Sequence, residues 1–184
     1  MYHIKLDKRS QQSAHLICEG LMSCLKKKSF DKITITDIQK ESSVGRATFY
    51  RLFDNISDVL SYQWFILCLN VVENQVGKEN YSTKELILSF IQNWIKNELL
   101  LETILINNRI DIIITALNNN KDILTELFFE NSNLDEEKKE YVTSAAIVAL
   151  VSAVMFCFGD TKERSAEKIY NNMKESCELL IKFM

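Results

Sequence analysis

The apolar residues of this 184-residue chain recur at steps of three and four, which is the spacing of amphipathic helices. In residues 10–28 the apolar stripe comprises Ala14, Ile17, Cys18, Leu21 and Leu25. Six later stretches repeat this spacing, at residues 57–76, 83–97, 99–106, 109–131, 136–158 and 165–183. Proline is absent and glycine occurs only four times, which disfavours a sheet protein with many tight turns. The pattern predicts an all-α fold of about nine helices.

Between residues 30 and 60 the pattern changes to two short helices with a tight turn between them. The first is predicted to begin at about Thr36, because the Thr36 hydroxyl and the Gln39 side chain have the spacing of a capping box. It is predicted to end near Ser42, where weak helix formers and Gly45 follow in succession. Val44 is the one large apolar residue of this turn, and we expect it to plug the turn against the core.

The second short helix, residues 46–53, combines an apolar face with a row of hydrogen-bond donors. Phe49 and Phe53 are four residues apart and therefore fall on one face. The other side chains include four donors and no acid: Arg46, Thr48, Tyr50 and Arg51. Arginine can give paired hydrogen bonds to guanine, and hydroxyl groups can donate to phosphate oxygens. This composition suits the anionic surface of DNA, and the two short helices together predict a helix-turn-helix.

Charge is distributed unevenly about the same region. Through Asp54 the chain has ten Lys and Arg against six Asp and Glu, whereas the remainder has twelve against nineteen. A basic N-terminal part would be drawn to phosphates and an acidic remainder would be repelled, which would orient the molecule on DNA. An imbalance of this size also arises by chance in small domains, so the charge alone decides nothing.

Three motifs follow one another here: Thr36-x-Ile38, then VGRATFYRLF at residues 44–53, then Asp58-Val59-Leu60. Together they resemble the DNA-binding domain of the TetR family of bacterial transcriptional regulators over residues 10–62. The T-F-Y-x-x-F core within residues 44–53 is the most specific part of the resemblance. The resemblance implies an N-terminal three-helix helix-turn-helix domain, residues 1–55. A helical ligand-sensing and dimerisation domain, residues 56–184, would follow.

The resemblance also implies which residues contact DNA. Thr36, Thr48 and Tyr50 would hold phosphates, and the remaining polar positions would reach phosphates or base edges. The full predicted set is Thr36, Ser43, Arg46, Ala47, Thr48, Tyr50 and Arg51.

Some of these positions have plainer interpretations. The Thr36 hydroxyl could serve as the helix cap, since capping uses the same oxygen. Tyr50 could be a core residue, although two phenylalanines already fill that face. The lysine run at residues 26–28 could contact DNA or form a solvated helix end that suits the helix dipole. Three cationic residues ahead of the first helix could also touch phosphates: Lys5, Lys8 and Arg9.

Four positions depart from the pattern of the family. Ser43 stands where the family usually has a glycine in the turn, and Gly45 stands where it often has a capping serine. Leu52 replaces a frequent His or Tyr, and Ile56 replaces a lysine at the start of the next helix. Backbone contacts are therefore missing, and we expect a shallower salt dependence of DNA binding than in typical relatives, by about 0.9 in log–log slope for each lost phosphate contact.

The second half of the helix predicted at residues 136–158 is apolar on nearly every side and carries small residues that would let another helix approach. A helix that is apolar all round must be covered all round. Two terminal helices from each of two chains would form a four-helix bundle, which is how TetR-like proteins dimerise. The alternative is the buried central helix of a monomer. The predicted interface residues are Ala145, Ala149, Ser152, Ala153, Phe156, Ile169, Met173 and Leu180.

No ligand motif occurs in the C-terminal part of the chain. Several residues fall on the helices that, by the resemblance, enclose the effector cavity of the family. They are Tyr62, Phe65, Phe90, Trp94, Thr103 and Asn107. An aromatic lining would suit an apolar or aromatic small molecule, but at helical spacing the same residues are also ordinary core.

Other functional classes find little support. The five cysteines are scattered without short pairs, which indicates buried thiols in a reducing cytosol rather than disulfides or metal ligands. Two histidines, no glycine-rich phosphate loop and no nucleophile with a paired base predict no enzyme, cofactor or metal site. No signal-like segment or apolar run of about 20 residues occurs, so we expect a cytoplasmic protein without a membrane partner.

These features predict a DNA-binding transcriptional regulator. The first hypothesis is a ligand-responsive repressor that binds a palindromic operator as a homodimer and answers to an unidentified small-molecule effector. The alternative is a helix-turn-helix activator or adaptor whose C-terminal domain binds a partner protein.

Overall fold

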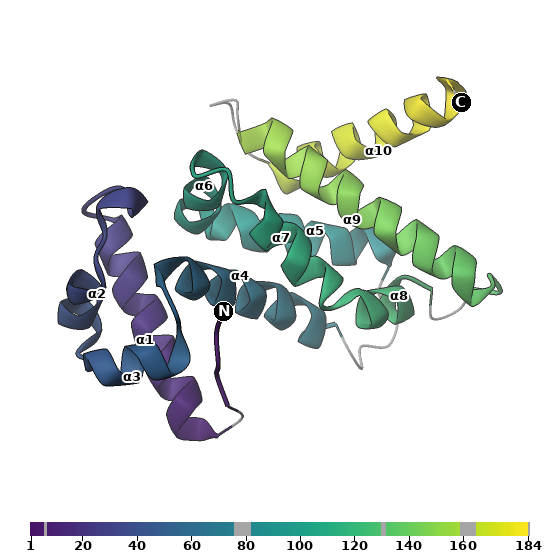
Figure 1. The fold of residues 1–184 in the computed structure, drawn as a ribbon. Coiled ribbons are helices and arrows are strands. Elements are labelled where there is room, and N and C mark those ends of the chain that lie inside the picture. The colour runs from purple at the N-terminus through teal and green to yellow at the C-terminus, as the bar shows by residue number, and fades with distance from the viewer. Residues whose placement is uncertain (6, 76–81, 130–131, 159–164, 184) are drawn as a thin grey trace.

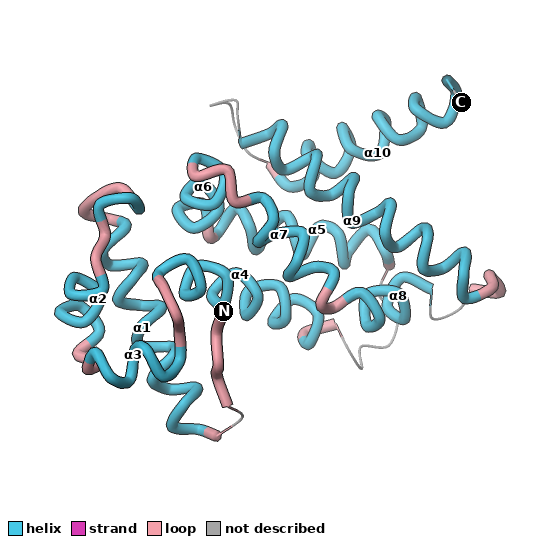
Figure 2. Tube along the Cα trace, viewed as in Figure 1, coloured by secondary structure: helices cyan, strands magenta, loops and turns pink. Residues whose placement is uncertain are grey.

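The computed structural model describes residues 1–5, 7–75, 82–129, 132–158 and 165–183. Within these ranges it contains ten α-helices and one 3-10 turn but no strand, which confirms the all-α prediction with one more helix than expected. Figure 2 shows that helix makes up most of the described part of the chain. In Figure 1 the first three helices lie at one end of the molecule, while α9 and α10 lie on the side away from them.

The N-terminal end, which we call the head, is built from three helices and the 3-10 turn. These are α1 (Lys8–Leu25), η1 (Phe30–Lys32), α2 (Ile35–Ser42) and α3 (Arg46–Leu52). Helix α1 begins at Asp7, whose carboxylate accepts a hydrogen bond from the backbone N–H of Ser10 at 2.9 Å. The predicted apolar stripe of α1 is buried in full, so the 3.6-residue period placed this helix correctly.

Helix α1 packs closely on α2, and Gly20 is the reason that it can. A Cβ atom at Gly20 would lie 2.9 Å from the Ser42 Cβ and 3.0 Å from the Ile38 carbonyl oxygen. Ordinary Cβ contacts are longer than this. The two helices therefore approach at a point where any side chain would push them apart.

The N-cap of helix α2 lies two residues before the predicted one. Its N-cap is Thr34, whose hydroxyl accepts from the Asp37 N–H at 3.2 Å while the Asp37 carboxylate accepts from the Thr34 N–H at 2.8 Å. The predicted capping box of Thr36 and Gln39 is therefore wrong. An aspartate in the first turn interacts better with the positive end of the helix dipole than a neutral glutamine does.

Helix α4 (Ile56–Glu73) connects the head to the rest of the chain, which we call the body. Its N-cap is Asn55, in a second capping box with Asp58. Helix α4 packs against α1 in the head and against α5, α6 and α7 in the body. Trp64 and Cys68 are fully buried along it. The orientation of α4 thus sets how the head sits on the body.

Six further helices complete the body: α5 (Thr83–Lys96), α6 (Glu98–Ile106), α7 (Ile110–Asn118), α8 (Lys121–Phe129), α9 (Glu136–Phe158) and α10 (Ala166–Phe183). Ser82 caps α5 in a capping box with Glu85, and Asp135 accepts from the Lys138 N–H at the start of α9. The stretch expected as a single helix over 109–131 is two helices, α7 and α8, and the break falls within the run of three asparagines at residues 118–120. Asn120 is buried there and donates to the Ala116 carbonyl at 2.8 Å.

The cysteines behave mostly as small apolar side chains. Cys18, Cys24 and Cys68 are buried, and burial raises the pKa of the Cys18 and Cys68 thiols to about 12. Cys177 is exposed, so the prediction that it is buried is wrong. The side chain of Cys157 lies outside the described part of the chain.

Candidate nucleic-acid interface

Helix α3 is held in place by the side chains on its inner face. Phe49, Leu52 and Phe53 are buried, and the Phe49 and Phe53 ring centroids are 5.9 Å apart. Val44 is buried beneath the turn as predicted. Leu52 therefore packs in the core and does not face solvent. The His or Tyr that is frequent at this position in the family was expected to contact the DNA backbone, and Leu52 makes no such contact possible.

The turn between α2 and α3 is tight because Ser43 adopts the left-handed conformation, with φ 58° and ψ 15°. Its N–H donates to the Gln39 carbonyl at 2.9 Å and closes helix α2. Gly45 caps α3 without a side-chain hydrogen bond. A residue with a side chain seldom occupies this backbone region, so Ser43 carries a conformational cost that a glycine would not.

The outer face of α3 presents its hydrogen-bond donors to solvent. Arg46, Ala47 and Arg51 are exposed and Thr48 is half-buried. Tyr50 is 45% exposed, so it is not a core residue. The Arg46 Nη2 donates to the Tyr50 hydroxyl at 3.3 Å, and its guanidinium lies 5.5 Å from the Tyr50 ring centroid. This cation–π contact holds both side chains against the outer surface of the helix.

Thr36 lies exposed in the first turn of α2, because Thr34 takes the capping role. The alternative in which Thr36 serves as the cap is therefore wrong, and its hydroxyl is not engaged at the helix start. Ser43 is also exposed, at the corner between α2 and α3. The predicted DNA-binding residues thus come from three consecutive pieces of structure: the start of α2, the turn, and the outer face of α3.

Two of the three lysines at the end of α1 join α1 to α2. Lys27 pairs with Glu41 at 2.6 Å, and Lys28 pairs with Asp37 at 2.5 Å. Lys28 lowers the pKa of Asp37 below its usual range, and Lys27 does the same to Glu41. These lysines therefore support the helix-turn-helix from behind, which favours the structural interpretation of the run over contact with DNA.

Residues 1–5, which we call the N-terminal arm, run back along the end of α3. The His3 N–H donates to the Leu52 carbonyl at 2.8 Å, and Tyr2 forms an antiparallel bridge with Phe53. The His3 Nε2 lies 2.9 Å from Asp54 Oδ1. Nothing local in the sequence predicts this attachment, because it joins residues about 50 positions apart by backbone hydrogen bonds that any residue types could make.

The six residues predicted to line an effector cavity fall into separate packing groups. Tyr62 and Phe65 lie half-buried under the N-terminal arm, where their ring centroids are 5.2 Å and 6.4 Å from the Tyr2 ring. Phe90 and Trp94 are buried against each other, and Trp94 also packs on Trp64 at 5.5 Å. In α6, Thr103 is buried and bonded to the Leu99 carbonyl, and Asn107 bonds to the Thr103 carbonyl.

The predicted interface residues lie on α9 and α10, and most of them are at least partly exposed. Ala145, Ser152 and Leu180 are exposed, and Ala149, Ala153 and Met173 are half-buried. Ile169 is only 3% exposed and packs in the core of its own chain, so it is not available to a partner. The side chain of Phe156 lies outside the described part of the chain.

No family model matches the sequence, and no curated protein matches it either. Solved structures do match. A protein named Lin0861 from Listeria innocua is 20% identical, with a TM-score of 0.73 over 97% of this chain and 96% of that one. A TetR transcriptional regulator from Streptococcus agalactiae 2603V is 15% identical, with a TM-score of 0.58 over 89% of this chain and 92% of that one.

A third match is AlkX from Dietzia sp. strain DQ12-45-1b, a TetR family repressor implicated in the biodegradation of n-alkanes. It is 14% identical, with a TM-score of 0.58 over 96% of this chain and 97% of that one. The fold of the whole chain is therefore that of TetR transcriptional regulators, a class of DNA-binding proteins. Among the helices that the structure describes, none is long and apolar enough to cross a membrane.

Proposed function

We propose that this protein is a DNA-binding transcriptional regulator that binds a pseudo-palindromic operator as a homodimer and acts as a ligand-responsive repressor. The observation that carries the proposal is the outer face of α3, where Arg46, Tyr50 and Arg51 are exposed on a helix whose inner face is buried. A rigid helix with unneutralised donors on one side suits the major groove. We divide the chain at residue 55, with residues 1–55 as the DNA-binding domain and 56–184 as the effector and dimerisation domain.

An exposed apolar stripe on α9 supports the homodimer. Its apolar residues are Tyr141, Ala145, Val148 and Met155, and the small residue Ser152 completes the series, which recurs at steps of four and three. Val148 is 61% exposed and Met155 is 48% exposed, whereas Ile147 and Leu150 on the inner side are buried. A stripe with this period is what one helix presents to another in a left-handed bundle. One chain leaves it uncovered, so a second copy is the natural cover.

The C-terminal half of α10 adds to the same proposal. Its exposed apolar residues are Leu179, Leu180, Ile181 and Phe183. Helices α9 and α10 pack against each other within one chain, so two copies would bring four helices together. The dimer would set its two α3 helices to enter successive major grooves, which are about 34–36 Å apart or a multiple of that distance.

Repression would be relieved if an effector in the body favoured a different separation of the two heads. Helix α4 would transmit the change because it packs on α1 and on α7. To move operator occupancy from 99:1 to 1:99, the effector must distinguish the two states by about 5.5 kcal/mol.

A second candidate function is an activator or adaptor whose body docks a partner protein. The packing of Phe90 and Trp94 favours it, because both side chains are fully buried and behave as core rather than as a cavity lining. A thermal-shift screen with apolar and aromatic compounds separates the two candidates. Stabilisation that also weakens operator binding supports the repressor, whereas operator binding that changes only with a protein partner supports the adaptor.

The experiment that tests DNA reading is a selection of genomic fragments by the purified protein at physiological salt, followed by sequencing of the retained fragments. We expect one short inverted repeat close to a promoter. A control with Arg46, Tyr50 and Arg51 each replaced by alanine should retain no such repeat. If the unaltered protein enriches no specific sequence, the proposal that it reads DNA by itself is wrong.

A further inference from the structure

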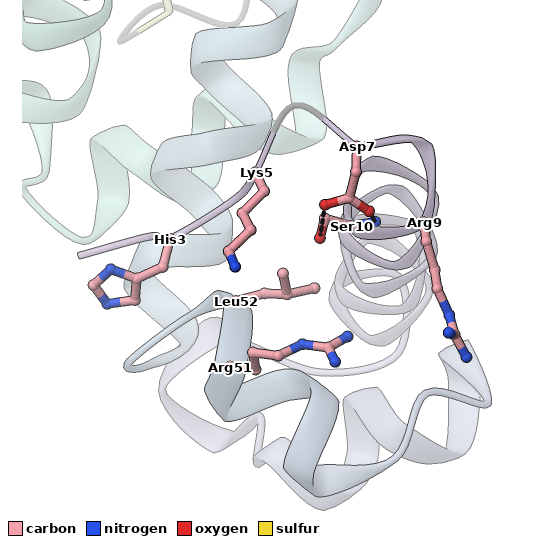
Figure 3. A pocket seen from close by; sticks show the side chains of 7 residues that line it. All are labelled: His3, Lys5, Asp7, Arg9, Ser10, Arg51 and Leu52. Carbon is pink, nitrogen blue, oxygen red and sulfur yellow. Dashed lines mark hydrogen bonds between the residues drawn. The ribbon is translucent and has the colours of Figure 1, made fainter.

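The N-terminal arm and helix α3 enclose a cleft of about 290 Å³ at the C-terminal end of α3. Its lining residues come from the arm, the start of α1 and the end of α3 (Figure 3): His3, Lys5, Asp7, Arg9, Ser10, Arg51 and Leu52. In Figure 3 the Lys5 side chain extends from the arm toward Leu52, and the Arg51 side chain extends beneath Leu52 toward α1. Three separate segments of the chain thus each contribute one cationic side chain to the cleft.

The charge of this cleft is strongly positive. Lys5, Arg9 and Arg51 line it, and none of the three forms an ion pair with any residue in the described part of the chain. The one acid is Asp7, and its carboxylate already accepts hydrogen bonds from the Ser10 N–H at 2.9 Å and the Ser10 hydroxyl at 2.8 Å. These bonds lower the pKa of Asp7 and occupy it as the cap of α1. The cations therefore remain available to an external anion.

The position of Lys5 depends on how the arm is attached. Tyr2 packs on the Tyr62 ring, with centroids 5.2 Å apart, and the next residue bonds to the Leu52 carbonyl. The His3 Nε2 lies 2.9 Å from Asp54 Oδ1, two residues past the end of α3. These contacts hold the arm antiparallel to the end of α3 and bring Lys5, which is far from Arg51 in sequence, to the same cleft.

We propose that this cleft is a phosphate site that clamps a backbone phosphate of the DNA beside the segment that α3 reads. A phosphodiester accepts several hydrogen bonds from cations placed around it, which is what Lys5, Arg9 and Arg51 offer. Arg51 belongs both to the outer face of α3 and to the cleft. The sugar–phosphate backbone of a duplex docked on α3 would therefore run past the cleft. The inference rests on the proposed DNA binding and adds a contact from outside the helix-turn-helix.

The test measures the salt dependence of DNA binding for single charge changes. Fluorescence anisotropy with the selected operator between about 50 and 200 mM salt gives the slope of log K against log salt concentration. Lys5→Gln should lower the magnitude of this slope by about 0.9, and Lys5→Gln combined with Arg9→Gln should lower it by about 1.8. Lys26→Gln is the matched control, because Lys26 is exposed at the other end of α1, about 25 Å from Arg9.

A charge-neutral variant tests the role of the arm as a positioning element. Tyr2→Ala removes the ring that anchors the arm on α4. It releases Lys5 from the cleft without removing any cationic residue from the chain. It should lower the slope by the same amount as Lys5→Gln, an effect that loss of stability alone would not produce. A slope for Tyr2→Ala equal to that of the unaltered protein would show that Lys5 does not need the docked arm, which contradicts the proposed clamp.

Free inorganic phosphate could bind the same cations as a DNA phosphate, and a second experiment distinguishes the two ligands. Titration calorimetry with inorganic phosphate on the DNA-free protein should show no binding at millimolar concentration. Two results together would contradict the proposed clamp. The first is tight binding of inorganic phosphate that Lys5→Gln abolishes, and the second is a salt slope of DNA binding that is the same for Lys5→Gln and Lys26→Gln. The cleft would then bind a free anion and not the DNA backbone. If the unaltered protein binds no duplex at all, the proposed function fails instead.

Discussion

Replacing Gly20 with alanine should destabilise the protein, although the same change stabilises most helices. Gly20 lies within α1, and alanine is favoured over glycine in a helix interior by about 1 kcal/mol. At this position, however, the new methyl group would lie 2.9 Å from the Ser42 Cβ, 3.0 Å from the Ile38 carbonyl oxygen and 3.2 Å from the Ser42 nitrogen. Two of these three atoms belong to the backbone of α2 and cannot turn aside.

The size of the effect follows from these two opposing terms. Overpacking of a close contact costs about 1–3 kcal/mol, and the rigid backbone of α2 places this contact near the upper end. After the gain in helix propensity, a net loss of about 2 kcal/mol remains. For a chain of this length each kcal/mol changes the melting temperature by about 2–4 °C, so Gly20→Ala should melt about 4–8 °C lower.

The assays are thermal unfolding and urea unfolding, both followed by circular dichroism at one fixed protein concentration, because the stability of an oligomer depends on its concentration. Gln12 supplies the control because it is exposed on the same helix. The difference between Gln12→Gly and Gln12→Ala measures the propensity term alone and should be about 1 kcal/mol in favour of alanine. If Gly20→Ala is as stable as the unaltered protein or more so, the close approach of α1 and α2 is not as rigid as the geometry implies.

Four other changes test the remaining parts of the structure. Ser43→Gly should stabilise the protein by about 1 kcal/mol in urea unfolding, because glycine adopts the left-handed conformation without steric cost; no gain would mean that Ser43 is unstrained. Arg46→Ala should weaken operator binding by about 1–3 kcal/mol in anisotropy titrations with an unchanged melting temperature, and an equal loss on random DNA would make Arg46 a phosphate contact. If the proposed homodimer forms through α9, Val148→Glu should leave a monomer in analytical ultracentrifugation and abolish operator binding; a stable, DNA-binding dimer of this variant would place the interface elsewhere. The pKa of Asp37 lies below its ordinary value of 3.8, so its stabilising effect is present above that pH and is lost as the pH falls below it. Between about pH 6 and about pH 3 the free energy of unfolding should therefore fall more steeply for the unaltered protein than for Asp37→Asn. The same pH dependence in both proteins would count against the Lys28 and Thr34 contacts.

The sequence by itself determined the features that depend on neighbours within a few residues. The burial of Phe49 and Phe53 follows from spacing along one helix, and the cap at Ser82 follows from a side chain that bonds three residues ahead. The same local reasoning failed at Thr36, where two overlapping capping boxes were available. The one with Asp37 prevailed because its carboxylate also pairs with Lys28, which lies in the turn after α1.

Only the tertiary structure decided the features that join distant parts of the chain. The N-terminal arm docks on α3 and α4 through backbone hydrogen bonds and a tyrosine ring, and neither leaves a periodic signal in the sequence. The packing also decided which side of α9 remains uncovered. That helix is apolar almost all round in its second half, so no pattern along it could distinguish the side that packs on its own chain from the side that is left for a partner.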